Sequence, residues 1–350
     1  MKSRWGLALG LALTLAALAV VLFRWRTSGF SWHKFEASLG TVDWNWLTLS
    51  LVLILATYFG RALRWEVMLR PLTRNVNFIR LLTATCIGFT AVVLFGRAGE
   101  PVRPYLIARN EGVSFSSQVA AWVVERILDI LMILIIFGVA LTQVSHSEIR
   151  SSPRIAIILQ AGGAAAGVTG AACLALLIAL RQFRGRAQGR LLDALAFLPE
   201  AVRARIATFL TAFGEGAQST RSSFFTVLLL LYSMLEWVVI VCCFYCVFRA
   251  FPATAGLGFA DIIIVLGFIS FGSVVQIPGV GGGMQIVTVL VLTEFYGVGL
   301  EAASSIALML WLVSFFIIVP VGLALAFHEG IKWRSLRNIG SGAAAPGVPG

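Results

Sequence analysis

The sequence predicts an all-α fold, a polytopic membrane helical bundle with about six full spans plus two broken or re-entrant hairpins. Of the 350 residues, 59% are hydrophobic and 12% are charged, and the mean hydropathy is +0.92. This composition excludes a soluble core of that size. The apolar windows show no period-two alternation, which excludes an outer-membrane barrel.

The full spans are expected where long windows carry few charges. The first window follows Lys2 and Arg4, but its apolar run is too long for a signal peptide, so we interpret it as an uncleaved span. The second window is shorter, and we expect Arg61 and Arg64 to snorkel from its end. The expected spans are Leu7–Phe23, Trp46–Gly60, Val119–Leu141, Ile155–Leu180, Phe224–Phe248 and Ala302–Phe327.

Two further apolar segments are short and end in glycine-rich breaks. Leu81–Phe95 runs into Gly96–Arg103, and Ile262–Ile277 runs into Pro278–Gly283, which Met284–Leu292 follows. At about 1.5 Å per residue, the first two segments reach roughly 23 Å, short of the ~30 Å hydrocarbon core. Interrupted segments at corresponding places in two halves are typical of an inverted repeat around a substrate pathway.

The distribution of basic residues predicts the topology. Arginines are frequent after the second span and after Leu180, and basic residues recur in the C-terminal tail. The positive-inside rule places these regions and both termini on the cytoplasmic side of the inner (plasma) membrane. That placement requires Leu81–Phe95 to enter and return on the same side. For the second break, charge parity permits two crossings or one hairpin, and length favours the hairpin.

We expect one integral membrane domain over residues 1–338. Its two halves, at about 44–180 and 222–327, are joined by an amphipathic cytoplasmic linker at 185–221. Pro199 divides the linker into two short pieces, and the Gly/Ala/Pro-rich tail at 339–350 is expected to be disordered.

Composition also argues against several kinds of function. The net charge of +11 is explained by cytoplasmic loops and anionic lipid head groups, so we expect no nucleic-acid partner. The five cysteines lie inside apolar segments and the three histidines are scattered. We therefore expect no metal, no cofactor, no catalytic residues and no enzyme activity.

Charged residues inside the spans are candidate binding groups because burying them is costly. Glu125, Arg126 and Asp129 share one helix, at spacings that allow contact. They are either a self-neutralising structural group or a site for a head group or ion, with one negative charge in excess. Glu236 is alone in its span; it is either protonated or paired with Arg126 or with a basic group of the first break.

The two breaks supply further candidates. Arg97, Glu100 and Arg103 recur every three residues, so one helical turn would align them, and arginine suits bidentate phosphate binding. The alternative is an ordinary charged turn held by its own Glu–Arg pair. In the second break, backbone N–H groups near Gly279, Gly282 and Gly283 could bind an anion, although no nucleotide-binding fingerprint is present.

These motifs, taken in order, resemble the lysylphosphatidylglycerol synthase transmembrane-region family. The resemblance rests on Gly96–Arg103, Glu125-Arg126 with Asp129, and Pro278-Gly279 with its glycine cluster, and it covers about Trp46 to Phe327. Two departures are Leu94-Phe95, where the family often has a proline, and Gln285, where it often has a glutamate. The resemblance implies a flippase-like protein, and we expect no aminoacyl-transferase domain here.

The leading hypothesis is movement of an anionic phospholipid or polyprenyl-phosphate-linked intermediate between leaflets. The expected partners are membrane lipids with an anionic head group, and a homo-oligomer is compatible with the sequence. The alternative is a non-transporting membrane partner that docks a lipid-modifying or glycosyltransferase enzyme.

Overall fold

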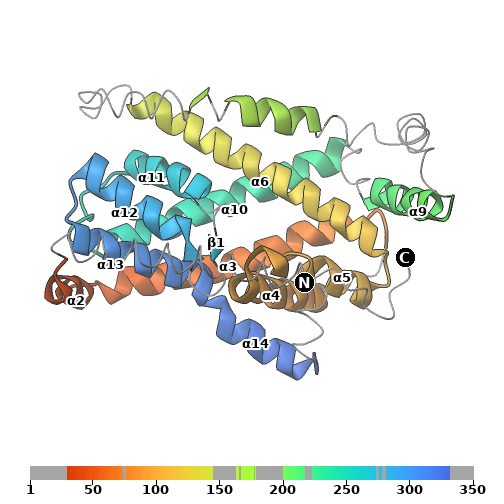
Figure 1. The fold of residues 1–350 in the computed structure, drawn as a ribbon, viewed down its shortest axis with the longest axis horizontal. Coiled ribbons are helices and arrows are strands. Elements are labelled where there is room, and N and C mark those ends of the chain that lie inside the picture. Colours follow the sequence, from red (N-terminus) through yellow and green to blue (C-terminus); the bar gives the residue numbers. More distant parts are fainter. Residues whose placement is uncertain are drawn as a thin grey trace, which may run out of the picture.

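A computed structural model describes residues 30–73, 76–144, 163–164, 167–176, 178, 200–216, 223–272, 276–277 and 281–331. This part of the chain is almost entirely helical (Figure 1). Its elements are α2 (Trp32–Gly40), α3 (Trp44–Leu69), α4 (Phe78–Phe95), the 3-10 turn η1 (Gly96–Gly99), α5 (Val102–Glu111), α6 (Phe115–Val144), α9 (Glu200–Gly216), α10 (Ser223–Arg249), α11 (Phe259–Gly272), β1 (Gln276–Ile277), β2 (Gly281–Gly282), α12 (Gly283–Tyr296), α13 (Leu300–Trp311), the π-helical turn η4 (Leu312–Phe316) and α14 (Ile318–His328).

The predicted all-α membrane bundle is confirmed. Among the described residues, four helices are long and apolar enough to cross a membrane: Trp44–Leu69, Phe78–Gly99, Phe224–Arg249 and Leu300–His328. Helix α6 has 30 residues and carries the internal charges of the expected third span. The expected span at Leu7–Phe23, the tail at 339–350 and parts of Ile155–Leu180 and of the linker lie outside the described residues, so the number of spans stays a prediction.

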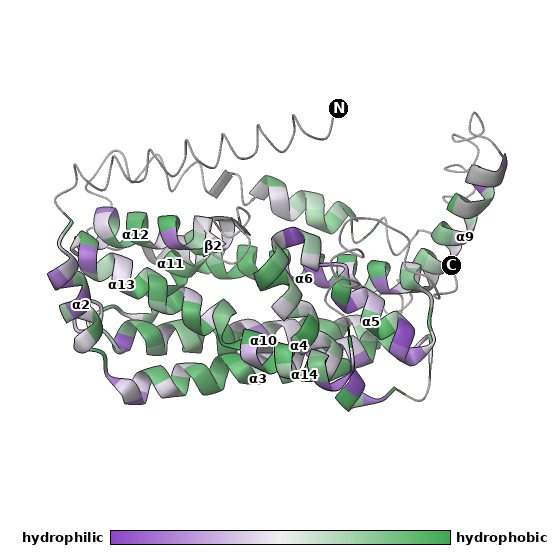
Figure 2. Ribbon diagram, turned by 60° about the horizontal axis from the view of Figure 1, so that its bottom comes forward, coloured by the Kyte–Doolittle hydropathy of each residue, from purple (hydrophilic) through white to green (hydrophobic). Residues whose placement is uncertain are grey.

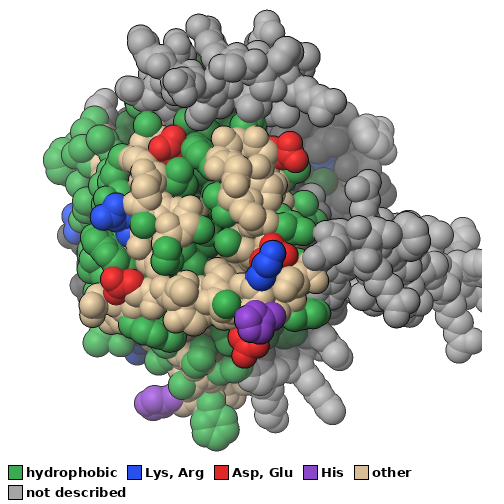
Figure 3. Space-filling view, turned by 90° about the vertical axis from the view of Figure 1, so that its left-hand side faces the viewer, with side chains coloured by type: hydrophobic (Ala, Val, Ile, Leu, Met, Phe, Trp, Pro, Cys, Tyr) green, Lys and Arg blue, Asp and Glu red, His purple; other side chains and the backbone are tan. Residues whose placement is uncertain are grey.

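The long helices are hydrophobic along most of their length, and many of the hydrophilic residues lie near their ends (Figure 2). The end of the molecule near α2 carries basic, acidic and histidine side chains scattered among apolar ones, without a patch of one sign (Figure 3). This distribution suits a molecule whose ends meet water and whose middle meets hydrocarbon.

Helices α4 and α5 form the first hairpin, in which the chain returns along itself. A Cβ at Gly99 would overlap the backbone of Ala91, so the turn lies directly against α4. At the open end, the Asn77 N–H donates to Glu111 Oε2 at 3.4 Å. Both ends of the hairpin therefore lie together, as a re-entrant segment requires.

The length argument for this segment was wrong. The helix begins at Phe78 rather than Leu81, because the Asn77 side chain caps it by accepting from the Arg80 N–H at 3.2 Å. With η1 it continues to Gly99, which is long enough to span by length and composition. The hairpin is thus defined by contacts between its arms and not by a shortage of residues.

The second hairpin consists of α11 and α12, two 14-residue arms that pack against each other. Strands β1 and β2 join them as an antiparallel pair, with Gln276 opposite Gly282 and Ile277 opposite Gly281. Each arm spans about 21 Å, less than the ~30 Å hydrocarbon core. The expected boundaries shift, but both arms remain too short to cross.

The tips of the two hairpins meet each other. Strand β1 of the second hairpin contacts η1 of the first. The two hairpins approach this point from opposite ends of the long axis (Figure 1). Two interrupted elements therefore converge on one region.

The contacts of the two halves repeat, which fits the expected inverted repeat. Helices α3 and α10 precede the hairpins and pack extensively on each other. The long helix after each hairpin packs on the first arm of the other: α6 on α11, and α14 on α4. A glycine permits close approach at each crossing, since a Cβ at Gly267 would overlap Phe137 and one at Gly322 would overlap Thr90.

Each hairpin belongs to its own hydrophobic cluster. On α3, Ile54 lies in the cluster around the second hairpin, and Ala62 lies in the cluster around the first. On α10, Leu229 lies in the cluster around the first hairpin, and Ile240, which comes later in the chain, lies in the cluster around the second. The order along α10 is therefore the reverse of that along α3. The boundary between the clusters therefore crosses both central helices, and polar residues lie there.

The last long helix is interrupted by a wide turn. In η4 the Ile317 N–H donates to the Leu312 carbonyl at 3.0 Å, an i to i+5 bond. Pro320 supplies a cause, because it has no N–H for the Phe316 carbonyl and its ring clashes with that carbonyl in a regular helix. Such turns often occur at functional sites.

Candidate functional site

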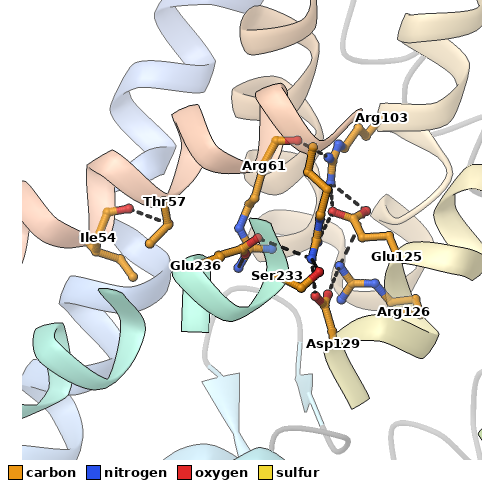
Figure 4. A network of polar contacts seen from close by, with 10 residues as sticks. Ile54, Thr57, Arg61, Arg103, Glu125, Arg126, Asp129, Ser233 and Glu236 are labelled. Carbon is orange, nitrogen blue, oxygen red and sulfur yellow. Dashed lines mark hydrogen bonds and ion pairs between the residues drawn. The ribbon is translucent and has the colours of Figure 1, made fainter. Parts of the chain in front are cut away.

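Arg64 of α3 is the centre of a buried ionic network, which Figure 4 shows from close by. Its side chain is 0% exposed. Nη2 donates to Glu125 Oε1 at 2.6 Å, and Nη1 donates to Asp129 Oδ1 at 2.7 Å. Nη1 also donates to Ser233 Oγ of α10 at 2.9 Å. Burying a guanidinium is tolerated only when such partners offset its lost hydration.

The two acids of α6 each bind a second arginine. Glu125 and Asp129 lie one turn apart and face α3 together. Glu125 accepts from Arg103 Nη1 with both oxygens, at 3.1 and 3.0 Å. Asp129 Oδ2 lies 3.0 Å from Arg126 Nη2. The network therefore joins α3, α5 of the first hairpin, and α6.

Glu236 connects α10 to the same network through α3. Its Oε1 lies 2.8 Å from Arg61 Nη2, and its Oε2 lies 3.4 Å from Arg64 Nη1. Of the two alternatives for Glu236, the pairing with Arg126 or with the first break was wrong, and protonation stays a prediction. Arginines of α3 occupy the position instead, because α3 and α10 are direct neighbours.

Seven ionisable side chains make up this network, and we call them the ionic cluster. They are Arg61, Arg64, Arg103, Glu125, Arg126, Asp129 and Glu236. Four arginines face three carboxylates, which gives a formal net charge of +1 (4 − 3). The excess negative charge predicted within α6 remains there, and arginines of α3 and α5 offset it.

Aromatic rings support Arg103 inside the bundle. Its guanidinium lies 3.9 Å from the centre of the Trp65 ring and 5.5 Å from that of Phe89. The Trp65 indole N–H donates to Gln118 Oε1 at 2.9 Å, which fixes the ring. A Cβ at Gly88 would overlap Arg103, so glycine lets α5 press this arginine against α4.

Two cavities adjoin the ionic cluster. The first, about 70 Å³, lies between the first hairpin and α6 and is lined by Glu100, Arg103 and Arg126 among others. The second, about 150 Å³, lies between α3, α10, the second hairpin and η4, and Arg61 lines it. Phe89 lines both cavities, and the Arg61 guanidinium lies 4.6 Å from its ring centre.

The structure does not align the three charged residues of the first break. Arg97 lies on η1 with 59% of its side chain exposed, 3.6 Å from Glu100. Arg103 points instead into the bundle, toward Glu125. The tight 3-10 turn separates the two arginines, so their expected alignment on one helical turn was wrong, and phosphate binding by either one stays a prediction. Arg97 and Glu100 match the alternative of a self-paired charged turn.

The glycines of the second break are only partly described. The Gly282 N–H donates to Gln285 Oε1 at 2.7 Å, so this N–H is not open to an anion. Gly283 is buried in the first turn of α12. Gly279 lies outside the described residues. An anion site on these backbone N–H groups remains a prediction.

Arg61 and Arg64 are the site residues that the sequence analysis missed. We expected them to snorkel from the end of a span that stops at Gly60. Helix α3 in fact continues to Leu69, and Arg64 is fully buried. The apolar run Trp65, Val67, Met68 and Leu69 was the available signal, since these residues are buried on the same helix. A second signal was that the two acids of α6, Glu125 and Asp129, needed more basic partners than Arg126 alone.

Fold and site together define a polytopic α-helical membrane protein with two opposed hairpins and an ionic cluster of four arginines and three carboxylates. The family model described as the lysylphosphatidylglycerol synthase TM region matches residues 7–322. The chain belongs to this family, which confirms the resemblance drawn from the motifs. A comparison with curated proteins finds no match.

Proposed function

We propose that this protein moves an anionic phospholipid or a polyprenyl-phosphate-linked intermediate between the leaflets of the inner (plasma) membrane. Membership of the family supports a lipid-related role for a membrane protein. The leaflet movement, the phosphate-bearing substrate and the cytoplasmic termini belong to the proposal.

One observation carries this proposal: the tips of two opposed hairpins meet beside a cluster with one more arginine than carboxylates, in which the Arg126 side chain is still 41% exposed. A structural ion-pair network needs no excess of either charge. An excess of arginine favours a negatively charged ligand, and guanidinium groups match phosphate oxygens in pairs. Opposed interrupted elements are also where membrane carriers bind substrates.

The test is head-group accessibility in proteoliposomes that contain trace fluorescent lipids. A membrane-impermeant quencher reports how much of each lipid reaches the outer leaflet. The panel compares phosphatidylglycerol, phosphatidic acid, a polyprenyl phosphate and phosphatidylcholine. We expect the wild type to move at least one anionic lipid faster than empty vesicles do.

The variants Arg103→Ala and Glu125→Gln should slow this movement by about tenfold or more, because each removes a charge-assisted contact in the cluster. Arg70→Gln is the matched control, since Arg70 lies at the end of the same helix as Arg64 with 51% of its side chain exposed. Elution as a single species in size exclusion shows that a variant is folded.

Wild-type protein that moves no lipid of the panel would refute the proposal. The alternative, a non-transporting partner of a lipid-modifying or glycosyltransferase enzyme, would then be tested by co-purification with such an enzyme.

A further inference from the structure

The lining of the second cavity includes two polar side chains that do not belong to the ionic cluster. Two polar side-chain atoms on its wall, Trp237 Nε1 and Ser314 Oγ, are buried without a hydrogen-bond partner among the described residues. A buried polar atom in this state is unfavourable unless something binds it. Both atoms therefore mark a place for a ligand.

The chemistry of the lining selects the ligand. An indole N–H and a guanidinium can only donate hydrogen bonds, and a hydroxyl can donate. Arg61 lines the same cavity with 15% of its side chain still exposed, while its Nη2 pairs with Glu236 Oε1 at 2.8 Å. The described lining residues include one arginine and no carboxylate. A cation is therefore disfavoured, and an oxyanion fits.

The backbone around Ser314 supports the same interpretation. Ser314 and its neighbour Phe315 lie in the wide turn η4 and line the cavity. A π-type turn places side chains outside the regular helical positions. Apolar residues of α10 and α11, among them Phe244 and Leu266, complete the wall. The cavity thus offers donors beside hydrocarbon, as a lipid phosphate with its first chain atoms requires.

We propose that this cavity is a phosphate-binding site, in which Arg61, Trp237 Nε1 and Ser314 Oγ hold one phosphate group of a lipid. This proposal rests on the proposed function and adds the place where the lipid head group binds. It uses an arginine of α3 and not the Arg97 and Arg103 pair that the sequence favoured. Because Phe89 lines this cavity and the first one, the site lies one side chain away from Arg103.

The experiment is a calorimetric titration of the purified full-length protein in detergent. The probes are dioctanoyl phosphatidic acid, dioctanoylglycerol, which has the same chains without phosphate, and inorganic phosphate. The variants Trp237→Phe and Ser314→Ala remove one donor each with little change of shape. Trp44→Phe is the matched control, because Trp44 is an exposed tryptophan at the start of α3.

We expect wild type to bind phosphatidic acid and not dioctanoylglycerol. Trp237→Phe and Ser314→Ala should each weaken binding by about 5- to 10-fold, and Arg61→Gln by more, since its bond is charge-assisted. Trp44→Phe should bind as wild type does. Unchanged affinity in both Trp237→Phe and Ser314→Ala would overturn the proposal. Binding of inorganic phosphate alone, without the lipid, would overturn the assignment to a lipid phosphate.

The same variants in the vesicle assay separate this proposal from the proposed function. If lipid movement continues unchanged in Trp237→Phe and Ser314→Ala, the lipid does not bind at this site during transport. The proposed transport function would still hold. Binding that depends on these donors in a protein that moves no lipid would support the site and refute the transport.

Discussion

Replacing Arg64 by glutamine should destabilise the protein more than any other single change in the ionic cluster. Removing one partner of a buried ion pair typically costs about 3–5 kcal/mol of unfolding free energy, because the remaining charge stays buried. Arg64 contacts all three carboxylates of the cluster. Each carboxylate keeps one other arginine within 3.0 Å. We therefore expect Arg64→Gln to lower the unfolding free energy by about 3 kcal/mol, near the lower end of that range.

The assay is equilibrium unfolding in mixed micelles with increasing SDS, followed by tryptophan fluorescence. Arg70→Gln is the control on the same helix. Its pair with Glu66 is 3.2 Å long with 51% of the arginine side chain exposed, so we expect a loss of about 1 kcal/mol or less. The double variant Arg64→Gln/Asp129→Asn should be less destabilised than the sum of the single variants, since the two side chains share one contact. If Arg64→Gln is no more destabilising than Arg70→Gln, the cluster does not hold the helices together.

Three further outcomes follow from the packing. Gly322→Ala should lower the unfolding free energy by about 1–3 kcal/mol, because its methyl overlaps α4; Gly138→Ala, with nothing within 4 Å, should show no loss in the same SDS titration. Gln118→Leu removes the acceptor of a buried indole N–H and should lower thermal stability by about 1–3 kcal/mol, so an unchanged melting curve would contradict that role. In a background lacking the native cysteines, Ile79→Cys and Arg109→Cys should react with an impermeant maleimide from the same side of the membrane, and labelling from opposite faces would disprove the first hairpin.

The sequence predicted the membrane bundle and the second hairpin from local composition, and the first hairpin from the distribution of basic residues along the chain. Apolar length, glycine and proline are properties of a short window, and the breaks at Gly96 and Gly283 were recognisable from it. The boundaries were less certain, since capping by Asn77 added a turn to the first arm. The apolar pattern of a short window does not show whether a capping side chain will extend the helix beyond the apolar residues.

The candidate site was only partly predictable. Glu125, Asp129 and Glu236 were visible as charges inside apolar windows, and the structure brings all three together. Their partners were not visible, because Arg64 follows Gly60 at what looks like the end of a span. Whether Arg61 or Arg64 is buried depends on the tertiary contacts of α3 with α6 and α10. Those contacts cannot be predicted from a short window of sequence.

The division of the ionic cluster along the chain has a consequence for how the protein is made. Arg61 and Arg64 emerge from the ribosome with α3, before α6 supplies Glu125 and Asp129 and long before α10 supplies Glu236. A lone arginine or aspartate in the centre of an inserting helix is unfavourable by roughly 2.5–3.5 kcal/mol. The C-terminal part of helix α3, which carries both arginines, is therefore fully stabilised only when its acidic partners arrive. Biogenesis of the first half is thus a cooperative step, and a ribosome stalled between α5 and α6 should leave α3 incompletely inserted.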